Sequence, residues 1–252
     1  MGLLAFQDNM IFYPTEADNP NFPRYQRQEI SLESHGFHIQ GWEFQNPDVD
    51  NNATLLYFGG NAEDVTQNFA DIQQFAARRL FFFNYRGYGK SGGKPSQQAL
   101  YQDVLNIYDS LTSQYAVQPE QLVVMGRSLG SAVATYVAAH RPVKQVILVT
   151  PFDSLTNIAQ SIFPFLPVKW FLNHPFPSVE FAPEINTPLL MIVAANDEVI
   201  PTKYSRNLYE KWAGAKQWQR LEGVGHNDLQ IHPHYYGLIR RFIEEGNSQK
   251  DR

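Results

Sequence analysis

Four short runs of apolar residues divide the chain, at residues 80–83, 122–125, 146–149 and 189–193. Each run is four or five residues long and contains no polar position. This is the pattern of a strand that is buried on both faces, which is typical of parallel sheets covered by helices. The runs therefore predict the centre of an α/β sheet.

The segments around these runs predict the rest of the fold. Residues 30–33 and 37–44 flank a turn and predict an antiparallel hairpin, and residues 53–58 predict another strand. A last helix is predicted at residues 235–245. Between the first two runs, apolar residues recur at helical spacing; they are Leu100, Val104, Ile107, Tyr108 and Leu111. Strand and helix alternate, so we expect helices on both faces of a mostly parallel sheet.

Composition changes this picture mainly by exclusion. With 252 residues, 43% of them hydrophobic, the chain has the size of one α/β domain, and no repeat or linker divides residues 1–252. The net charge of −5, with Lys and Arg dispersed, argues against a nucleic-acid partner. The sequence contains no cysteine, which excludes thiolate metal sites and a cysteine nucleophile.

A glycine-rich stretch, NYRGYGKSGGKPS at residues 84–96, follows the first apolar run. Three of its glycines have the spacing of a dinucleotide-binding loop; they are Gly87, Gly89 and Gly92. The context opposes a nucleotide, because the predicted helix starts only after Pro95, and Asn84 stands where a Walker loop needs glycine. We interpret the stretch as a tight loop at the carboxyl end of a strand, and we predict neither a cofactor nor a metal.

The second apolar run continues into LVVMGRSLGSAVA, which places the pattern G-x-S-x-G between a predicted strand and a predicted helix. A serine in this position sits in a strained turn that projects its hydroxyl above the sheet. The flanking Gly126 and Gly130 allow neighbouring backbone to approach closely. We therefore predict that Ser128 is a catalytic nucleophile.

A serine nucleophile needs a histidine base and an acid that orients the histidine, and in hydrolases of this type both follow the serine, acid first. His226, in the loop GVGHND before the last helix, fits the base. Two aspartates follow predicted strands, Asp197 in NDEVIP and Asp153 in PFDS. We favour Asp197 and keep Asp153 as the alternative.

The same chemistry requires an oxyanion hole, which is usually built from two backbone N–H groups. The first expected donor is Leu129, the residue after the nucleophile. The second lies in the loop GGNA, which follows the predicted strand at residues 53–58, and we assign it to Asn61.

Together these motifs resemble the α/β-hydrolase superfamily, and most of all its acyl-protein-thioesterase-like and bacterial esterase-like branch. YFGGNAEDV is similar to that branch's H-G-N-A oxyanion loop and NYRGYGKS to D-Y-R-G-Y-G-K-S, while GRSLGSAVA, NDEVIP and GVGHND complete the match. The resemblance implies an eight-stranded sheet, the triad Ser128, Asp197 and His226, and a glycine loop that forms a structural wall beside the active site. Gly59 and Asn84 depart from the family's histidine and aspartate, which questions how the oxyanion loop is supported.

The resemblance implies hydrolysis of carboxylic esters or thioesters of apolar acyl groups through an acyl-enzyme intermediate. Residues 154–181 form an apolar insertion, which predicts a small cap over an acyl pocket; a helix pair packed on the sheet is the alternative. The predicted substrate-binding residues of this cap are Ile162, Phe163, Trp170 and Phe171. A serine peptidase of the same fold and a catalytically silent binding module are the alternative functions.

The start of the chain bears on where the protein acts. Residues 2–6 carry no basic region and are too short for a signal peptide or a membrane span, which predicts a cytoplasmic protein. The expected partner is a small-molecule or acylated substrate, with possible proximity to a membrane. Relatives in the resembled branch often carry an N-terminal membrane anchor. A membrane-anchored protein with a longer natural N-terminus is therefore the alternative. The sequence indicates no oligomeric state.

Overall fold

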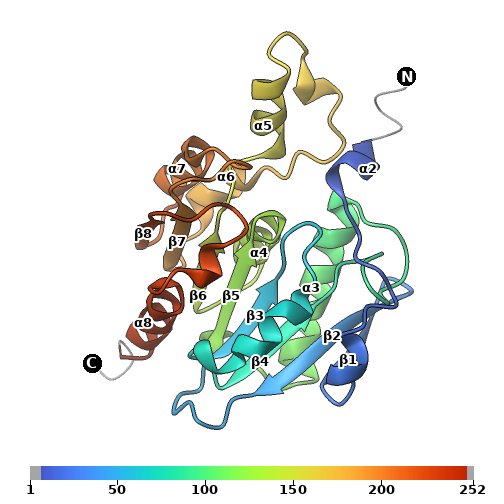
Figure 1. Cartoon of the computed structure of the whole chain (residues 1–252), viewed down its shortest axis with the longest axis vertical. Helices are drawn as coiled ribbons and strands as arrows, with labels where there is room; N and C mark the ends of the chain where they lie inside the picture. Colours follow the sequence, from blue (N-terminus) through green and yellow to red (C-terminus); the bar gives the residue numbers. More distant parts are fainter. Residues whose placement is uncertain (1–6, 249–252) are drawn as a thin grey trace.

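A computed structural model describes residues 7–248, so residues 2–6, on which the expected location rests, lie outside the described range. One eight-stranded sheet runs through the molecule in the order β1-β2-β4-β3-β5-β6-β7-β8 (Figure 1). The strands are β1 (Glu29–Ser34), β2 (Phe37–Gln45), β3 (Thr54–Phe58), β4 (Arg79–Phe83), β5 (Leu122–Arg127), β6 (Gln145–Val149), β7 (Leu189–Ala194) and β8 (Lys216–Leu221). β2 is antiparallel to its neighbours β1 and β4, and the other pairs are parallel. The expected eight-stranded, mostly parallel sheet is confirmed.

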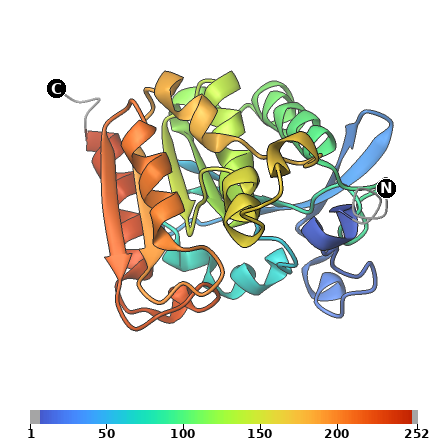
Figure 2. The same cartoon turned by 90° about the horizontal axis from the view of Figure 1, so that it is seen from above.

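Helices cover both faces of this sheet, as expected (Figure 2). The α-helices are α2 (Gln7–Ile11), α3 (Gln97–Ser113), α4 (Leu129–His140), α5 (Leu155–Ile162), α6 (Ser178–Phe181), α7 (Thr202–Lys211) and α8 (Tyr235–Ser248). The 3-10 helices are η1 (Phe22–Tyr25), η2 (Val65–Gln74), η3 (Pro119–Gln121), η4 (Val168–Trp170), η5 (Ala182–Glu184) and η6 (Leu229–Ile231). Between Gln7 and Ser248, no helix has both the length and the apolar character needed to cross a membrane.

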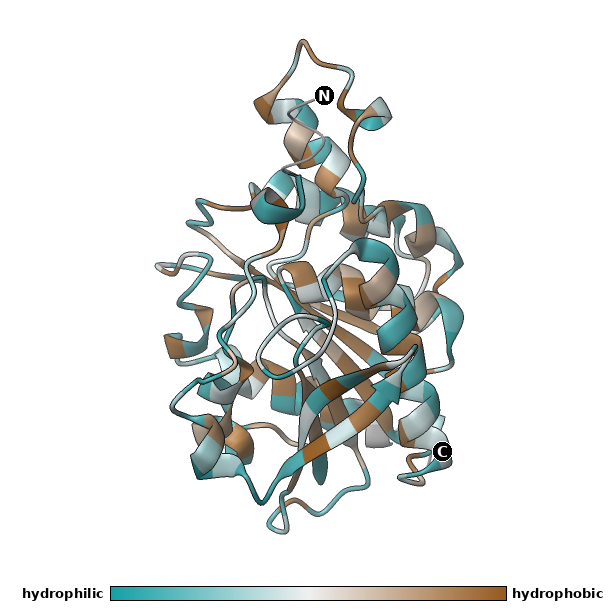
Figure 3. Cartoon of the chain, turned by 90° about the vertical axis from the view of Figure 1, so that its right-hand side faces the viewer, coloured by the Kyte–Doolittle hydropathy of each residue, from teal (hydrophilic) through white to brown (hydrophobic). Residues whose placement is uncertain are grey.

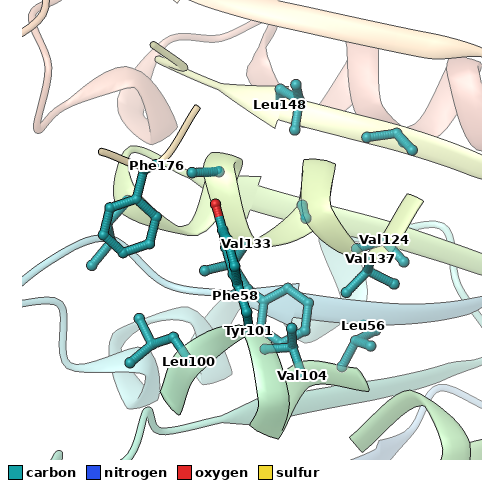
Figure 4. Close-up of a cluster of buried hydrophobic side chains, with 14 of the residues drawn as sticks. Leu56, Phe58, Leu100, Tyr101, Val104, Val124, Val133, Val137, Leu148 and Phe176 are labelled. Atoms are coloured by element: carbon teal, nitrogen blue, oxygen red, sulfur yellow. The ribbon is translucent and has the colours of Figure 1, made fainter. Parts of the chain in front are cut away.

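The two faces of the sheet form two separate hydrophobic cores. In β3, Leu56 and Phe58 join the core under α3, α4 and α7, whereas Leu55 and Tyr57 join the core under η2 and α8. This division follows from the alternation of side chains along a strand. Figure 4 shows the first core, in which Leu56 and Phe58 pack among side chains of α3 and α4. Burial on both faces explains why the four apolar runs within these strands contain no polar position.

The insertion at residues 154–181 lies between β6 and β7 and has two parts. Its end, α6, packs against α4 and α7. Its beginning, α5, has no buried residue and projects with η4 from the carboxyl end of the sheet (Figures 1 and 3). The insertion thus combines a packed base, as in the predicted helix pair, with a projecting part.

Candidate active site

Ser128 occupies a tight turn between β5 and α4. Its backbone has φ 51° and ψ −116°, in the left-handed region that side chains other than glycine rarely adopt. A Cβ atom on Gly126 would collide with the carbonyl oxygen of Gly130, and one on Gly130 would collide with that of Phe58. The two glycines therefore have the close-packing role that the sequence predicted.

The structure brings Ser128, His226 and Asp197 together. Nε2 of His226 lies 3.0 Å from Oγ of Ser128, and Nδ1 of His226 lies 2.9 and 3.0 Å from the two carboxylate oxygens of Asp197. The side chains of His226 and Asp197 are almost fully buried. Backbone N–H groups of Val199 and Ile200 donate to Oδ1 of Asp197 at 2.9 and 2.7 Å, which fixes the carboxylate.

Asp153, the alternative acid, has different partners. Its carboxylate accepts hydrogen bonds from the backbone N–H of Ser154 and from the side-chain amides of Asn157 and Asn207, at 2.6 to 2.8 Å. These contacts fix the start of α5 and its packing against α7. Of the two candidate acids, Asp197 is the one that contacts His226.

Ser128 and His226 open into a cavity of about 480 Å³. Asn61 also lines this cavity, and Leu129 is buried beside it as the first residue of α4. The amides of a first helical turn have no partner within the helix, which suits the predicted donor role of Leu129. The other lining residues are mostly polar: Gly60, Ala62, Glu63, Asp64, Gln67, Arg127, Val199, Asn227 and Gln230. In the described part of the chain, no group of three or more His, Asp or Glu side chains could hold a metal ion.

The four predicted substrate-binding residues do not line this cavity as the structure describes it. Their exposed fractions are 63% for Ile162, 42% for Phe163, 82% for Trp170 and 51% for Phe171. The physical reason is that α5, which has no buried residue, and the turn that follows it project away from the sheet (Figure 3). An acyl pocket lined by these side chains stays a prediction.

The loop predicted to supply the second oxyanion donor passes directly beside the nucleophile. A Cβ atom on Gly60 would lie 3.6 Å from Cβ of Ser128. The N–H of Gly60 donates to Oε2 of Glu63 at 2.7 Å, which closes the loop into a turn. Oδ1 of Asn61 accepts a hydrogen bond from the backbone N–H of Tyr13 at 3.0 Å, so the loop is also tied to the segment after α2.

The glycine-rich loop supports this oxyanion loop from the side. The hydroxyl of Tyr85 donates to the carbonyl oxygen of Gly59 at 2.6 Å, and that of Tyr88 donates to Oδ1 of Asn61 at 2.7 Å. Asn84 instead donates to Oε1 of Gln40 in β2 at 2.9 Å. Two tyrosines of the glycine-rich loop therefore hold a loop that departs from the family pattern at Gly59.

Sequence reasoning missed a charged bridge beneath the site. Arg127 donates to the carbonyl oxygen of His226 at 3.0 Å and lies 3.8 Å from Oε2 of Glu63. Glu63 also accepts from the hydroxyl of Tyr57 at 2.7 Å. Burial alone would lower the pKa of Arg127, but the neighbouring Glu63 and Tyr57 outweigh this effect. The pKa is therefore raised above its usual value, and the guanidinium stays charged. The only sequence signal was a cation at the variable position of G-x-S-x-G.

Comparison with known proteins agrees with this architecture, which is that of an α/β hydrolase. A family model described as "Serine aminopeptidase, S33" matches residues 50–182, and the chain belongs to this family within the α/β-hydrolase superfamily. The protein Rv2307c of Mycobacterium tuberculosis is 30% identical over 252 residues, which cover 97% of this chain and 90% of that protein.

Of two further comparisons, one covers less of the chain and the other concerns a less similar protein. Alpha/beta hydrolase domain-containing protein 17C of Mus musculus is 32% identical over 193 residues, which cover 75% of this chain and 59% of that protein. Among solved structures, an esterase of Pyrococcus furiosus has a TM-score of 0.71 at 17% identity, over 93% of this chain and 99% of the other. At 17% identity, the likeness to the esterase concerns the fold alone.

Proposed function

We propose that this hydrolase cleaves carboxylic ester bonds, and thioester bonds of the same acyl groups, with Ser128 as nucleophile. The observation that carries the proposal is the pair of contacts made by one imidazole. His226 faces Ser128 through Nε2 at 3.0 Å and Asp197 through Nδ1 at 2.9 Å. This geometry suits proton transfer from a hydroxyl to a histidine that a carboxylate holds in one tautomer.

The proposed reaction has two halves. In the first, Oγ of Ser128 attacks the acyl carbon while its proton moves to Nε2 of His226, and the same proton then leaves with the alcohol or thiol. In the second, a water molecule attacks the acyl-enzyme, gives its proton to His226, and releases the acid as the proton returns to Oγ. Asp197 orients the imidazole and stabilises its charged form throughout.

The oxyanion that forms in both halves needs donors on the side of Ser128 that faces the oxyanion loop. We assign them to the backbone N–H groups of Leu129 and Asn61, which flank the nucleophile from α4 and from the loop tied down by Tyr88. Both donors are backbone N–H groups, so stabilising the oxyanion requires no charged side chain.

The test is labelling by a fluorophosphonate probe together with hydrolysis of aryl esters and acyl thioesters of increasing chain length. We expect the wild-type protein and Ser113→Ala, a control at an exposed helix end, to be labelled, and Ser128→Ala to be unlabelled. Labelling that persists in Ser128→Ala contradicts the assignment of the nucleophile. An apolar acyl site should give a rate that rises with chain length and then falls.

A serine peptidase is the second candidate, because the matching family model carries an aminopeptidase description. The same constellation cleaves amides when the leaving amine is protonated by the histidine. Aminoacyl arylamides therefore belong in the substrate panel. Faster turnover of these amides than of any ester favours the peptidase while leaving the roles of Ser128, His226 and Asp197 unchanged.

A further inference from the structure

The projecting part of the insertion, residues 161–171, is called the cap tip below, and it gathers apolar side chains on the surface. Six of the ten large apolar side chains that are exposed among the described residues belong to it: Ile162, Phe163, Phe165, Leu166, Trp170 and Phe171. Phe165 is the most exposed at 96%. Single exposed apolar residues are normal, but a cluster of this kind marks an interaction surface.

The charge of the cap tip differs from that of the rest of the chain. The chain contains 25 acidic residues, yet none lies between Asp153 and Glu180. Lys169 is the only Lys or Arg in that interval, and it is exposed beside Trp170. Apolar side chains next to a Trp and a Lys are typical of segments at the boundary between lipid headgroups and acyl chains.

Several backbone groups of the cap tip are hydrogen-bonded within the tip itself. The side-chain amide of Gln160 donates to the carbonyl oxygens of Phe163, Pro164 and Leu166 at 2.9 to 3.3 Å. The same side chain accepts from the N–H of Val168 at 3.3 Å. Prolines at positions 164 and 167 have no N–H to satisfy. Internal satisfaction of polar groups is what a bilayer requires of any segment that enters it.

The cap tip is also held firmly at its base and faces outward. Gln7 in α2 donates to the carbonyl oxygen of Phe171 at 2.7 Å, and Asp8 contacts the imidazole of His174 at 2.8 Å. The tip projects from the end of the molecule at which β5 and β7 deliver Ser128 and Asp197 (Figures 1 and 3). A projecting segment that presents apolar side chains, a Trp and a Lys is suited to the interfacial region of a bilayer.

We infer that the cap tip inserts into the interfacial region of a lipid bilayer, with Phe165 among the acyl chains and Trp170 and Lys169 at the headgroup level. The carboxyl end of the sheet then faces the membrane. This inference does not rest on the proposed function, because it needs no reaction at Ser128.

The test mixes the full 252-residue chain with vesicles of phosphatidylcholine, either pure or mixed with phosphatidylglycerol. We expect the wild-type protein to float with both kinds of vesicle and to remain bound at high salt, because apolar burial drives insertion. Phe165→Ser combined with Leu166→Ser should weaken binding by about tenfold or more. Ile231→Ser removes an apolar residue on η6 that is 73% exposed, and this control should bind as the wild type does.

Tryptophan fluorescence supplies an independent readout. Trp42 and Trp212 are buried and Trp218 is partly buried, whereas Trp170 is 82% exposed, so insertion of the tip should shift the emission of Trp170 to shorter wavelength. Trp170→Phe should keep binding and lose most of that shift. If the double serine variant folds poorly, quenching of Trp170 in the wild-type protein by brominated phosphatidylcholine gives the same answer.

Three results would overturn the inference. The first is a wild-type protein that binds neither kind of vesicle. The second is binding only to the anionic vesicles that disappears at high salt, because it would come from charge elsewhere. The third is a wild-type protein that is oligomeric and does not bind vesicles, together with a double serine variant that is monomeric. The tip would then pack against a second copy of the chain.

Discussion

The surroundings of Ser128 and the cap tip both lie at the carboxyl end of the sheet, and they are built in opposite ways. Around Ser128, buried polar side chains are joined by contacts between distant segments, such as Arg127 to His226 and Tyr88 to Asn61. In the cap tip, residues 161–167 are all exposed, and one nearby side chain, Gln160, provides much of the hydrogen bonding.

This difference shows which residues determine the geometry of the site and which determine the surface of the cap tip. The site depends on positions fixed by the whole fold, so a single change there should propagate to chemistry. The cap tip depends on about a dozen neighbouring residues, so its surface can change while the sheet stays intact. Substitutions in the two regions should therefore have different consequences.

Ser128→Ala should break the chemistry alone. We expect kcat for a short aryl ester to fall by at least about 10³-fold, because only the oxyanion hole and substrate binding remain. The thermal midpoint should not fall, since the hydroxyl fills no core space. Steady-state kinetics and a thermal melt on the same sample measure both quantities. An active variant would remove Ser128 from the proposal.

The two aspartates separate a role in the site from a role in the fold. Asp197→Asn should lower kcat by about 10²-fold or more, because the amide no longer holds His226 in its working tautomer. Asp153→Asn should instead lower the free energy of unfolding by about 1–3 kcal/mol, because its new NH2 group replaces a carboxylate oxygen that accepts one or two of these hydrogen bonds. The reverse pattern in kinetics and denaturant melts would exchange the two assignments.

Arg127→Met should show that the bridge beneath the site positions His226. We expect kcat to fall by about tenfold to a hundredfold with a smaller change in KM, because the His226 loop loses its donor and Glu63 loses its cationic partner. Arg127→Lys should recover part of the loss by restoring the charge. Arg141→Met, at an exposed ion pair with Asp109, is the matched control and should leave kcat unchanged.

Asp64 tests the outer wall of the cavity through pH. Burial alone would raise its pKa, but hydrogen bonds from Thr66, Asn19 and Asn21 lower it overall. Asp64→Asn should therefore cost about 0.5–1 kcal/mol of stability at neutral pH, a small value because the half-exposed carboxylate is screened. A depressed folded-state pKa gives stability that is present above the unfolded pKa and lost as pH falls through the folded one. Denaturant melts of both proteins should accordingly converge in acid, and a gap that widens there would contradict the assignment.

Phe165→Ser should have the smallest effect on the isolated protein. The side chain is 96% exposed, so neither the thermal midpoint nor the rate with a water-soluble aryl ester should change beyond experimental error. A large loss of either property would mean that the cap tip is coupled to the site, against the contrast drawn above.

The sequence predicted the fold wherever a strand is buried on both faces or clearly alternates. Seven strands were found from patterning alone, whereas β8, with the sequence KQWQRL, was implied only by the family resemblance. β8 is an edge strand with a largely polar, partly exposed sequence, so it carries no apolar run. The strand signal therefore fails where burial on one side is incomplete.

The candidate site was predictable to the extent that local motifs carry it. The turn at Ser128, the loop of Asp197 and the loop of His226 each have a recognisable sequence, and the structure brings them together. The bridge from Arg127 to Glu63 has no such signal, because its partners are far apart in the chain and meet only after folding. The placement of the cap tip was equally hidden, since apolar composition does not tell whether a segment faces a cavity or the surface.

The backbone of Ser128 has a consequence for how this chain can evolve. Its φ of 51° and ψ of −116° cost a serine about 1–3 kcal/mol that a glycine would not incur. A lineage that had stopped using the hydroxyl would therefore gain stability by drifting to glycine at this position. A serine held in a conformation suited to glycine is what the nucleophile role proposed for Ser128 requires.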